Sequence, residues 1–240
     1  MSISMRKFKA LFKKDLVDFM KNPALSVSVL LPIAFVVLYK FVVSPNLDSK
    51  DLPAFLLNLG MLMNSSMCGV LIVSTSVAEE KEKFTLRTLM LSNVSAMEFF
   101  LSKIMLAMAA TLAGNVVIFF LAGEAVSHFP VYLLATILGT GCVIMISAVI
   151  GLVSRDQTSC SLLQIPVMLL FLIPPAMAAN AVLLMLARLT PLGAMLHIYY
   201  NIIQGKVGGK TVLAFVVIIA WLAGAAIAFK YFYKKKNIDN

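Results

Sequence analysis

Six long apolar runs alternate with shorter polar stretches along the chain. Each run has about the 20 residues that a helix needs to cross a hydrocarbon core of about 30 Å. None alternates apolar with polar residues, and lipid offers no water to an unpaired sheet edge, so helices are predicted rather than strands. The predicted spans are Leu25–Val43, Phe55–Val77, Ile104–Ala122, Val131–Val153, Leu162–Leu186 and Val212–Phe232.

Residues 4–21 show a different pattern. Their apolar side chains recur at three- and four-residue spacing, which gathers them on one face of a helix, with lysines on the other face. Such a helix lies in the headgroup layer, its lysines near anionic lipid. We therefore expect an amphipathic interfacial helix over 4–21 that ends at the Asn22-Pro23 break. A solvated basic tail is the alternative, although a tail does not require the phenylalanines.

The longest polar stretch, residues 78–103, follows the second span. Its first charges, Glu79 to Lys83, are expected to continue the second helix out of the membrane, and an apolar cluster follows them. Ser95 and Glu98 have the spacing of a capping box, so a helix is predicted to begin there. A loop that only connects two spans needs a few residues, so this segment is predicted to have a further role.

The region between the fifth and sixth spans is predicted to be irregular. Pro174 and Pro175 lie inside the fifth run and remove backbone donors, so the helix should kink or unwind there. The following stretch, Leu192–Gln204, is amphipathic but too short to span a membrane. Residues 176–205 are therefore predicted to form a helix end and short external or re-entrant helices.

Composition and charge assign a compartment and an orientation. Of the 240 residues, 61% are hydrophobic and only 13% are charged, so most side chains face lipid or one another. Fifteen lysines and arginines lie on the side that both termini share, against five on the other: Lys40, Lys50, Arg188, Lys206 and Lys210. The cytosolic side carries the excess, which predicts a multi-pass membrane protein with both termini in the cytosol. The net charge of +9 follows from this topology and does not indicate nucleic-acid binding.

Catalytic and ligand-binding motifs were not found. The stretch Gly205–Thr211 resembles a phosphate-binding loop, but the first glycine of that motif is Gln204 and no strand precedes it. Every Asp and Glu falls at a span end or in a loop, which disfavours a proton-coupled carrier. No catalytic, cofactor or metal residue is predicted. The cysteines and histidines have no ligand-like spacing: Cys68, Cys142, Cys160, His128 and His197.

Polar uncharged residues inside the spans have two interpretations. Hydrogen bonds between helices are common and contribute about 1 kcal/mol or less each. The functional alternative is a moderately polar translocation surface for an amphipathic substrate. The candidates for that surface are Asn58, Asn64, Ser65, Asn115 and Gln164.

The order of these elements resembles the type-2 permeases of ATP-binding-cassette (ABC) transporters. The resemblance covers nearly the whole chain as a single transmembrane domain over residues 1–240, and it is carried by Glu79–Leu89, by Ser95, Glu98 and Lys103, and by Leu189–Leu192. It implies a segment that docks on a cytosolic ABC ATPase dimer, with the N-terminal helix as a second contact. The implied docking residues are Glu79, Glu80, Lys81, Glu82, Phe84, Thr85, Leu86, Arg87, Leu89 and Met90. Two positions depart from the family pattern: a glycine usual before Thr85 is Phe84, and a proline usual in the turn is Asn93.

The resemblance also implies partners and a function. These are a second permease subunit, identical or paralogous, the lipid bilayer, and ATP with Mg on the ATPase, so the chain is not expected to be an enzyme. The expected function is the membrane subunit of a bacterial exporter that moves an amphipathic substrate, such as an antimicrobial peptide. Drugs, ions and lipid-linked glycans remain alternative cargoes, and a membrane scaffold or sensor subunit is the alternative class.

Overall fold

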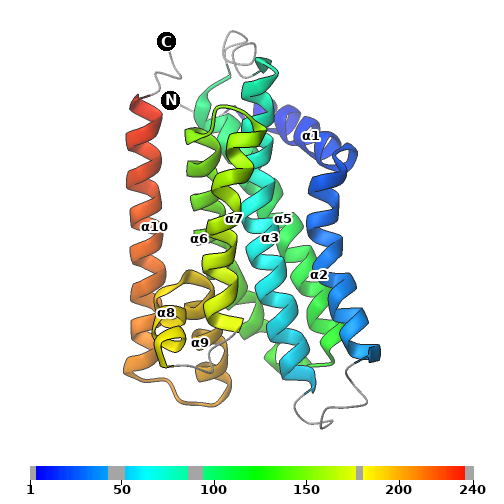
Figure 1. The fold of residues 1–240 in the computed structure, drawn as a ribbon, viewed down its shortest axis with the longest axis vertical. Coiled ribbons are helices and arrows are strands. Elements are labelled where there is room, and N and C mark those ends of the chain that lie inside the picture. Colours follow the sequence, from blue (N-terminus) through cyan, green and yellow to red (C-terminus); the bar gives the residue numbers. More distant parts are fainter. Residues whose placement is uncertain (1–3, 43–51, 86–93, 177–180, 236–240) are drawn as a thin grey trace.

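The computed structural model describes residues 4–42, 52–85, 94–176 and 181–235. Within these ranges the chain is helical and has no strand, which confirms the predicted all-α class (Figure 1). The helices are α1 (Met5–Lys21), α2 (Pro23–Val42), α3 (Leu52–Glu82), α5 (Ala96–Ala122), η2 (Val126–His128), α6 (Phe129–Val153), α7 (Gln157–Ala176), α8 (Ala181–Leu189), α9 (Pro191–Ile203) and α10 (Gly209–Lys235).

The first two helices meet at the predicted break. Asn22 has extended dihedral angles, and its Oδ1 accepts a hydrogen bond from the backbone N–H of Ala24 at 3.1 Å. Pro23 then begins α2, at a position where a missing N–H costs nothing. As a result α1 lies tilted across one end of the bundle instead of continuing along α2 (Figure 1).

Helix α3 is the centre of the bundle. It packs against α2, α5, α6 and α7, and most of its side chains are buried, including several serines and Asn64. Helix α10 packs on α6 and α9 at one side and buries little of its own surface. Helix α3 is therefore largely enclosed by its neighbours, whereas more of the surface of the other apolar helices is exposed.

Among the described residues, five helices are long and apolar enough to cross a membrane: α2, α3, α5, α6 with η2, and α10. They contain the first four predicted spans, apart from Val43, and the sixth. The predicted fifth span, Leu162–Leu186, is wrong as a single helix, because α7 ends at Ala176 and Ala181 begins the separate helix α8. A run of apolar residues does not record where the chain changes direction. With 20 residues, α7 still rises about 30 Å.

Two short helices, α8 and α9, lie within residues 176–205, where short helices were predicted. Helices α8 and α9 meet at an angle of 92°. At the bend, Thr190 Oγ1 donates to the carbonyl of Ala187 at 2.8 Å and accepts from the N–H of Gly193 at 3.0 Å. A Cβ on Gly193 would lie 1.8 Å from the Ala187 oxygen, so only glycine fits this bend. The Trp221 indole N–H, from α10, donates to the Leu189 carbonyl at 2.7 Å and holds the bend in place.

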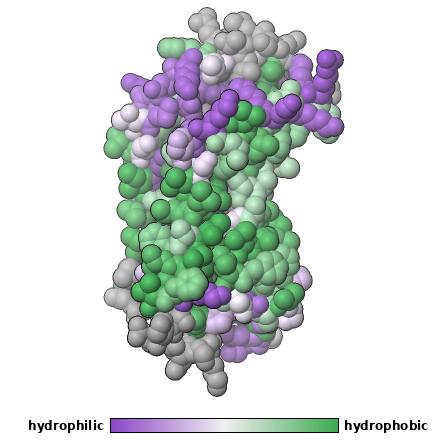
Figure 2. All heavy atoms as spheres, turned by 90° about the vertical axis from the view of Figure 1, so that its right-hand side faces the viewer, coloured by the Kyte–Doolittle hydropathy of each residue, from purple (hydrophilic) through white to green (hydrophobic). Residues whose placement is uncertain are grey.

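The surface has the distribution expected of a membrane protein. The face drawn in Figure 2 is mostly hydrophobic across its middle, and hydrophilic atoms gather mainly at the end that carries α1. The C-terminal end of α10 lies at that same end, beside the start of α5, where the rings of Phe229 and Phe100 are 4.8 Å apart (Figure 1).

Candidate functional site

The last turn of α3 carries four successive charged residues, Glu79 to Glu82. Successive residues of a helix are rotated by about 100°, so four in a row point in four directions. In this bundle each direction leads to a different neighbour. We call the resulting set of contacts, between Glu79–Glu82 and helices α1, α2, α5, α6 and α7, the charged junction.

Two of these residues bind the helices at the α1 side. Glu79 Oε2 accepts a hydrogen bond from Asn22 Nδ2, at the α1–α2 break, at 3.2 Å. Glu80 Oε1 accepts from Lys103 Nζ of α5 at 2.9 Å and from Lys14 Nζ of α1 at 2.5 Å. The glutamates therefore tie α3 to α1, α5 and the start of α2.

The other two bind the opposite side of α3. Lys81 Nζ donates to the carbonyls of Gly151, Leu152 and Ser154, at 2.8, 2.5 and 2.9 Å. These carbonyls belong to the C-terminal end of α6, where a cation is favoured by the helix dipole. Glu82 Oε2 accepts from the N–H of Gln157 at 3.0 Å, at the start of α7, where an anion is favoured.

The buried centre of the junction is Lys103, which is only 1% exposed. Besides Glu80, its ammonium group donates to Asp15 Oδ1 of α1 and to Ser76 Oγ of α3, both at 2.9 Å. Asp15 is also buried, and its second oxygen accepts from the hydroxyl of Ser102 at 2.5 Å. Glu80 Oε2, in contrast, is buried without a donor among the described residues. Such an unpaired oxygen costs about 1–3 kcal/mol.

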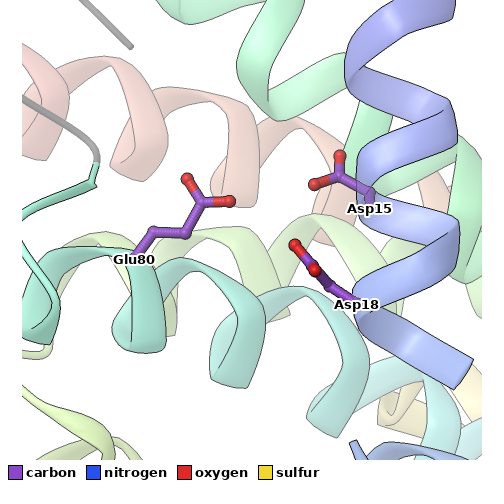
Figure 3. Close-up of side chains that lie close together, drawn as sticks. All are labelled: Asp15, Asp18 and Glu80. Atoms are coloured by element: carbon purple, nitrogen blue, oxygen red, sulfur yellow. The ribbon is translucent and has the colours of Figure 1, made fainter. Parts of the chain in front are cut away.

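Three carboxylates of the junction lie close enough to hold a cation. Asp15, Asp18 and Glu80 each offer an oxygen, and these atoms lie within 4.8 Å of one another (Figure 3). Positive charge is already present, since Lys103 bonds to Asp15 and Glu80, and Lys14 Nζ lies 3.5 Å from Asp18. The two lysines account for this acidic cluster, and we assign no metal to it.

Beyond the junction, the described chain continues only to Thr85. Lys83, Phe84 and Thr85 are exposed, and the Phe84 side chain is 78% exposed. Phe84 has φ = +56°, in the left-handed region, and is the one non-glycine residue with positive φ in the described ranges. Glycine adopts this conformation without strain, whereas other residues pay about 1–2 kcal/mol. The position where this sequence replaces the family's usual glycine is thus one where the backbone favours glycine.

The predicted docking residues divide into two sets. Glu79, Glu80, Lys81 and Glu82 have partners within the chain, and their side chains bind other helices of the bundle. Phe84 and Thr85 lie on the exposed turn that follows, where Thr85 Oγ1 donates to the Glu80 carbonyl at 3.2 Å. The rest lie outside the described residues: Leu86, Arg87, Leu89 and Met90.

Helix α5 begins as predicted. Ser95 Oγ accepts from the Glu98 N–H at 3.2 Å, and Glu98 Oε2 accepts from the Ser95 N–H at 3.0 Å, which confirms the capping box. The other oxygen of Glu98 accepts from the N–H of Ser4 at 2.7 Å, at the start of α1. Helix α1 is therefore attached at both ends and at its middle.

Three of the candidate translocation residues lie together between α3 and α5. Asn64 Nδ2 donates to the carbonyl of Thr111 at 2.8 Å and to Asn115 Oδ1 at 2.9 Å, and Asn115 Nδ2 donates to Ser65 Oγ at 3.2 Å. The side chains of Asn64, Ser65 and Asn115 are fully buried. Their geometry matches the first of the two interpretations, hydrogen bonds between helices.

The other two candidates lie elsewhere. Gln164 of α7 is buried, and its Nε2 donates to Ser74 Oγ at 2.7 Å and to Thr75 Oγ1 at 2.9 Å, both on α3. Asn58 Oδ1 accepts from the hydroxyl of Tyr200, on α9, at 2.8 Å. The five candidates thus form three separate contacts between helices and share no surface among the described residues.

Comparison with known proteins decides the family. The chain matches the model of a family described as ABC-2 family transporter protein over residues 45–230, more than half of its length. It belongs to the ABC-2 transporter family. Members of this family are transmembrane subunits of ABC transporters that work with an ABC ATPase, so the type-2 permease resemblance is confirmed. A sequence comparison with curated proteins returns no match.

The matched range of the ABC-2 family begins after α1 and α2 and includes Glu79–Glu82 and Lys103. Asp15 and Lys14, which complete the junction, lie outside it. Sequence reasoning missed Asp15 and Lys103 as partners. One signal was available, because Asp15 lies four residues after Leu11 and four before Phe19, a lone carboxylate on the apolar face of α1. A buried carboxylate requires a partner.

Proposed function

We propose that this chain is the membrane subunit of a bacterial ATP-driven exporter, in which the segment at residues 78–103 receives the movement of an ABC ATPase dimer. One observation carries the proposal: the four charged residues at the base of this segment are bound to α1, α2, α5, α6 and α7. A force applied to the segment would therefore reach most of the bundle.

The orientation follows from charge. The junction end carries the larger share of lysines and arginines, and Lys9 and Lys13 on α1 are exposed there. We place this end in the cytosol and α1 in the headgroup layer, with the exposed Leu16 and Met20 toward lipid. The bent pair α8–α9 is then external.

The coupling mechanism uses the difference between two ATPase states. ATP binding closes the ATPase dimer, and the docked segment follows this movement in each of two permease subunits. Energy flows if the ATPase states bind the two permease conformations with different affinity. The exposed ring of Phe84 provides apolar area for docking, and Lys83 beside it provides charge.

The cargo is proposed to be an amphipathic peptide. Support for a small cargo comes from the external elements among the described residues, which are the short helices α8 and α9. Drugs, ions and lipid-linked glycans remain alternative cargoes for the same machinery. A scaffold or sensor subunit would share the junction but would not stimulate or respond to ATP hydrolysis.

Co-purification with the ATPase tests the proposal. Because Glu80 is inside the junction, a change there would alter the bundle as well as docking, so the test uses the exposed turn. Phe84→Asp is expected to abolish co-purification with the ATPase while membrane insertion is retained. The control is Val126→Asp, at the opposite end and also exposed, which should leave co-purification intact. Retention of the ATPase by the Phe84 variant would contradict docking at this turn.

A further inference from the structure

Lys103 is a lysine without access to water at the place where three helices meet. Its three ammonium hydrogens are used by Asp15 from α1 and by Ser76 and Glu80 from α3, each at 2.9 Å. The ring of Phe99, one turn earlier on α5, lies 4.8 Å from Nζ. Every direction around this charge is thus occupied by α1, α3 or α5.

Stability alone is a poor explanation for this arrangement. Buried ion pairs are often no more stabilising than apolar side chains of similar volume, because both charges must leave water. This one also leaves Glu80 Oε2 without a donor in the part of the chain that the structure describes. What a buried ion pair supplies is a defined relative position of the two helices, since its hydrogen bonds weaken when their distance or angle leaves a narrow range.

This defined position matters because Lys103 joins two functional parts of the molecule, one at Glu80 on α3 and the other at Asp15 on α1. Glu80 is five residues before Thr85, so it forms the base of the exposed turn. Asp15 lies in the middle of α1. The other attachments of α1 are only partly buried: Ser4 and Asn22 bond at its two ends, and Lys14 bonds to Glu80 beside Asp15. Lys103 is the buried bridge between the base of the turn and the middle of α1.

We propose that Lys103 is a positioning residue that fixes α1 to the base of the coupling segment, so that α1 and the junction ends of α3 and α5 move as one unit when the ATPase closes. The inference rests on the proposed function and names the residue that transmits the movement to α1. Movement of the segment reaches α1 through Glu80, Lys103 and Asp15, in that order.

An apolar variant separates this role from simple stabilisation. Asp15→Leu, Glu80→Met and Lys103→Met together remove the buried charges and keep the volume, so the junction should stay packed. The complex with the ATPase is placed in lipid nanodiscs, and Val126→Cys, at the far end, reports the conformation. The rate of its modification by a membrane-impermeant thiol reagent is measured without nucleotide and with ATP and vanadate. The native Cys68, Cys142 and Cys160 are buried, so background labelling should be low.

In the otherwise unchanged protein we expect the labelling rate to differ by about fivefold or more between the two nucleotide states. In the apolar triple variant the ATPase should still co-purify and the thermal midpoint should be retained, but the difference in rate should disappear. The single variant Lys103→Arg keeps the positive charge and the hydrogen-bond donors, so most of the difference in labelling rate between the two nucleotide states should be retained. Lys14→Met is the matched control, since Lys14 bonds to the same oxygen of Glu80 from a half-exposed position and should leave the response intact.

The outcomes separate the two proposals. A full nucleotide response in the folded triple variant would overturn the role of Lys103 and leave the proposed function standing. Equal loss in the Lys14 variant would also overturn it, because any weakening of the junction would then suffice. Failure of the unchanged protein to retain the ATPase or to respond to nucleotide would overturn the proposed function itself.

Discussion

The two ends of the bundle are held together by different chemistry. At the α1 end, the contacts are charge-assisted hydrogen bonds that converge on Lys103 and the last turn of α3. At the opposite end, α9 packs on α6 through aromatic rings, with Tyr132 4.9 Å from Phe119 and 5.8 Å from Tyr199. Hydrogen bonds to charged groups are shorter and stronger than those between neutral groups, whereas ring contacts contribute mainly buried apolar area. The end proposed to receive force therefore depends on contacts between buried charges, whereas the far end depends on aromatic rings and on hydrogen bonds between neutral groups, such as Tyr200 to Asn58.

The largest expected effect is at the centre of the junction. Lys103→Ala should lower the free energy of unfolding by about 3–5 kcal/mol, because it leaves Asp15 and Glu80 buried without their cation. Unfolding in mixed micelles would measure it. A loss below about 1 kcal/mol would mean that water enters the junction and that the two ends differ less than their contacts indicate.

A smaller loss is expected from Ser102→Ala. The hydroxyl donates to a buried carboxylate oxygen, so its removal should cost about 1.5–3 kcal/mol in the same measurement. Ser161→Ala on α7 is the control, since this exposed serine bonds only to the carbonyl of Gln157 in its own helix. Equal effects of the two substitutions would argue against a special role for charge at the junction.

Phe84→Gly should raise the stability of the isolated subunit but weaken its binding to the ATPase. Relief of the positive φ should stabilise the isolated subunit by about 1 kcal/mol. Loss of the exposed ring should weaken binding of the ATPase, which a co-purification titration would detect. A variant that became both more stable and tighter binding would show that the ring makes no docking contact.

At the far end, Tyr199→Phe should change stability by less than about 1 kcal/mol. The Tyr199 ring is buried, but its hydroxyl has no hydrogen-bond partner among the described residues, so the substitution removes no bond. The loss of unfolding free energy can be compared directly with that of Ser102→Ala, since each substitution removes one hydroxyl oxygen. A large loss at Tyr199 would reveal a directional contact at the end that we describe as aromatic.

The smallest effect concerns pH. The backbone N–H and the hydroxyl of Ser159 lower the pKa of Asp156, in the turn before α7. This contribution is fully present above the ordinary pKa of aspartate and is lost as the pH falls through the lowered value of the folded protein. Asp156→Asn should remove a slight loss of stability on acidification. Identical pH profiles for both proteins would show that the turn does not contribute.

Much of the fold was predictable from local patterns. Apolar runs located five spans, Asn22-Pro23 located the first break, and Ser95 with Glu98 located the start of α5, because each signal lies within one or a few turns of helix. Pro174-Pro175 indicated a break in the fifth run and short helices after it, whereas the run itself was too long, since the residues on both sides of the break are apolar. The docking role of the exposed turn stays a prediction.

The charged junction illustrates the other limit. Glu79–Glu82 were expected to face a partner protein, because a sequence gives no position for the helices around α3. Asp15 and Lys103 are separated by 88 residues, so no spacing rule connects them. Asn64, Ser65 and Asn115 were recognised as polar residues in spans, but only the bundle shows that they bond to one another.

The Asp15–Lys103 bond also sets an order of assembly. During synthesis α1 emerges before α5, and its aspartate lacks the Lys103 cation until α5 has been made and inserted, several seconds of translation later at about 5–20 residues per second. Until then the described hydrogen bonds that attach α1 to α3 are those that Lys14 and Asn22 make with the end of that helix. Helix α1 is consequently completed as part of the junction only after α5, 88 residues later in the chain, is in place.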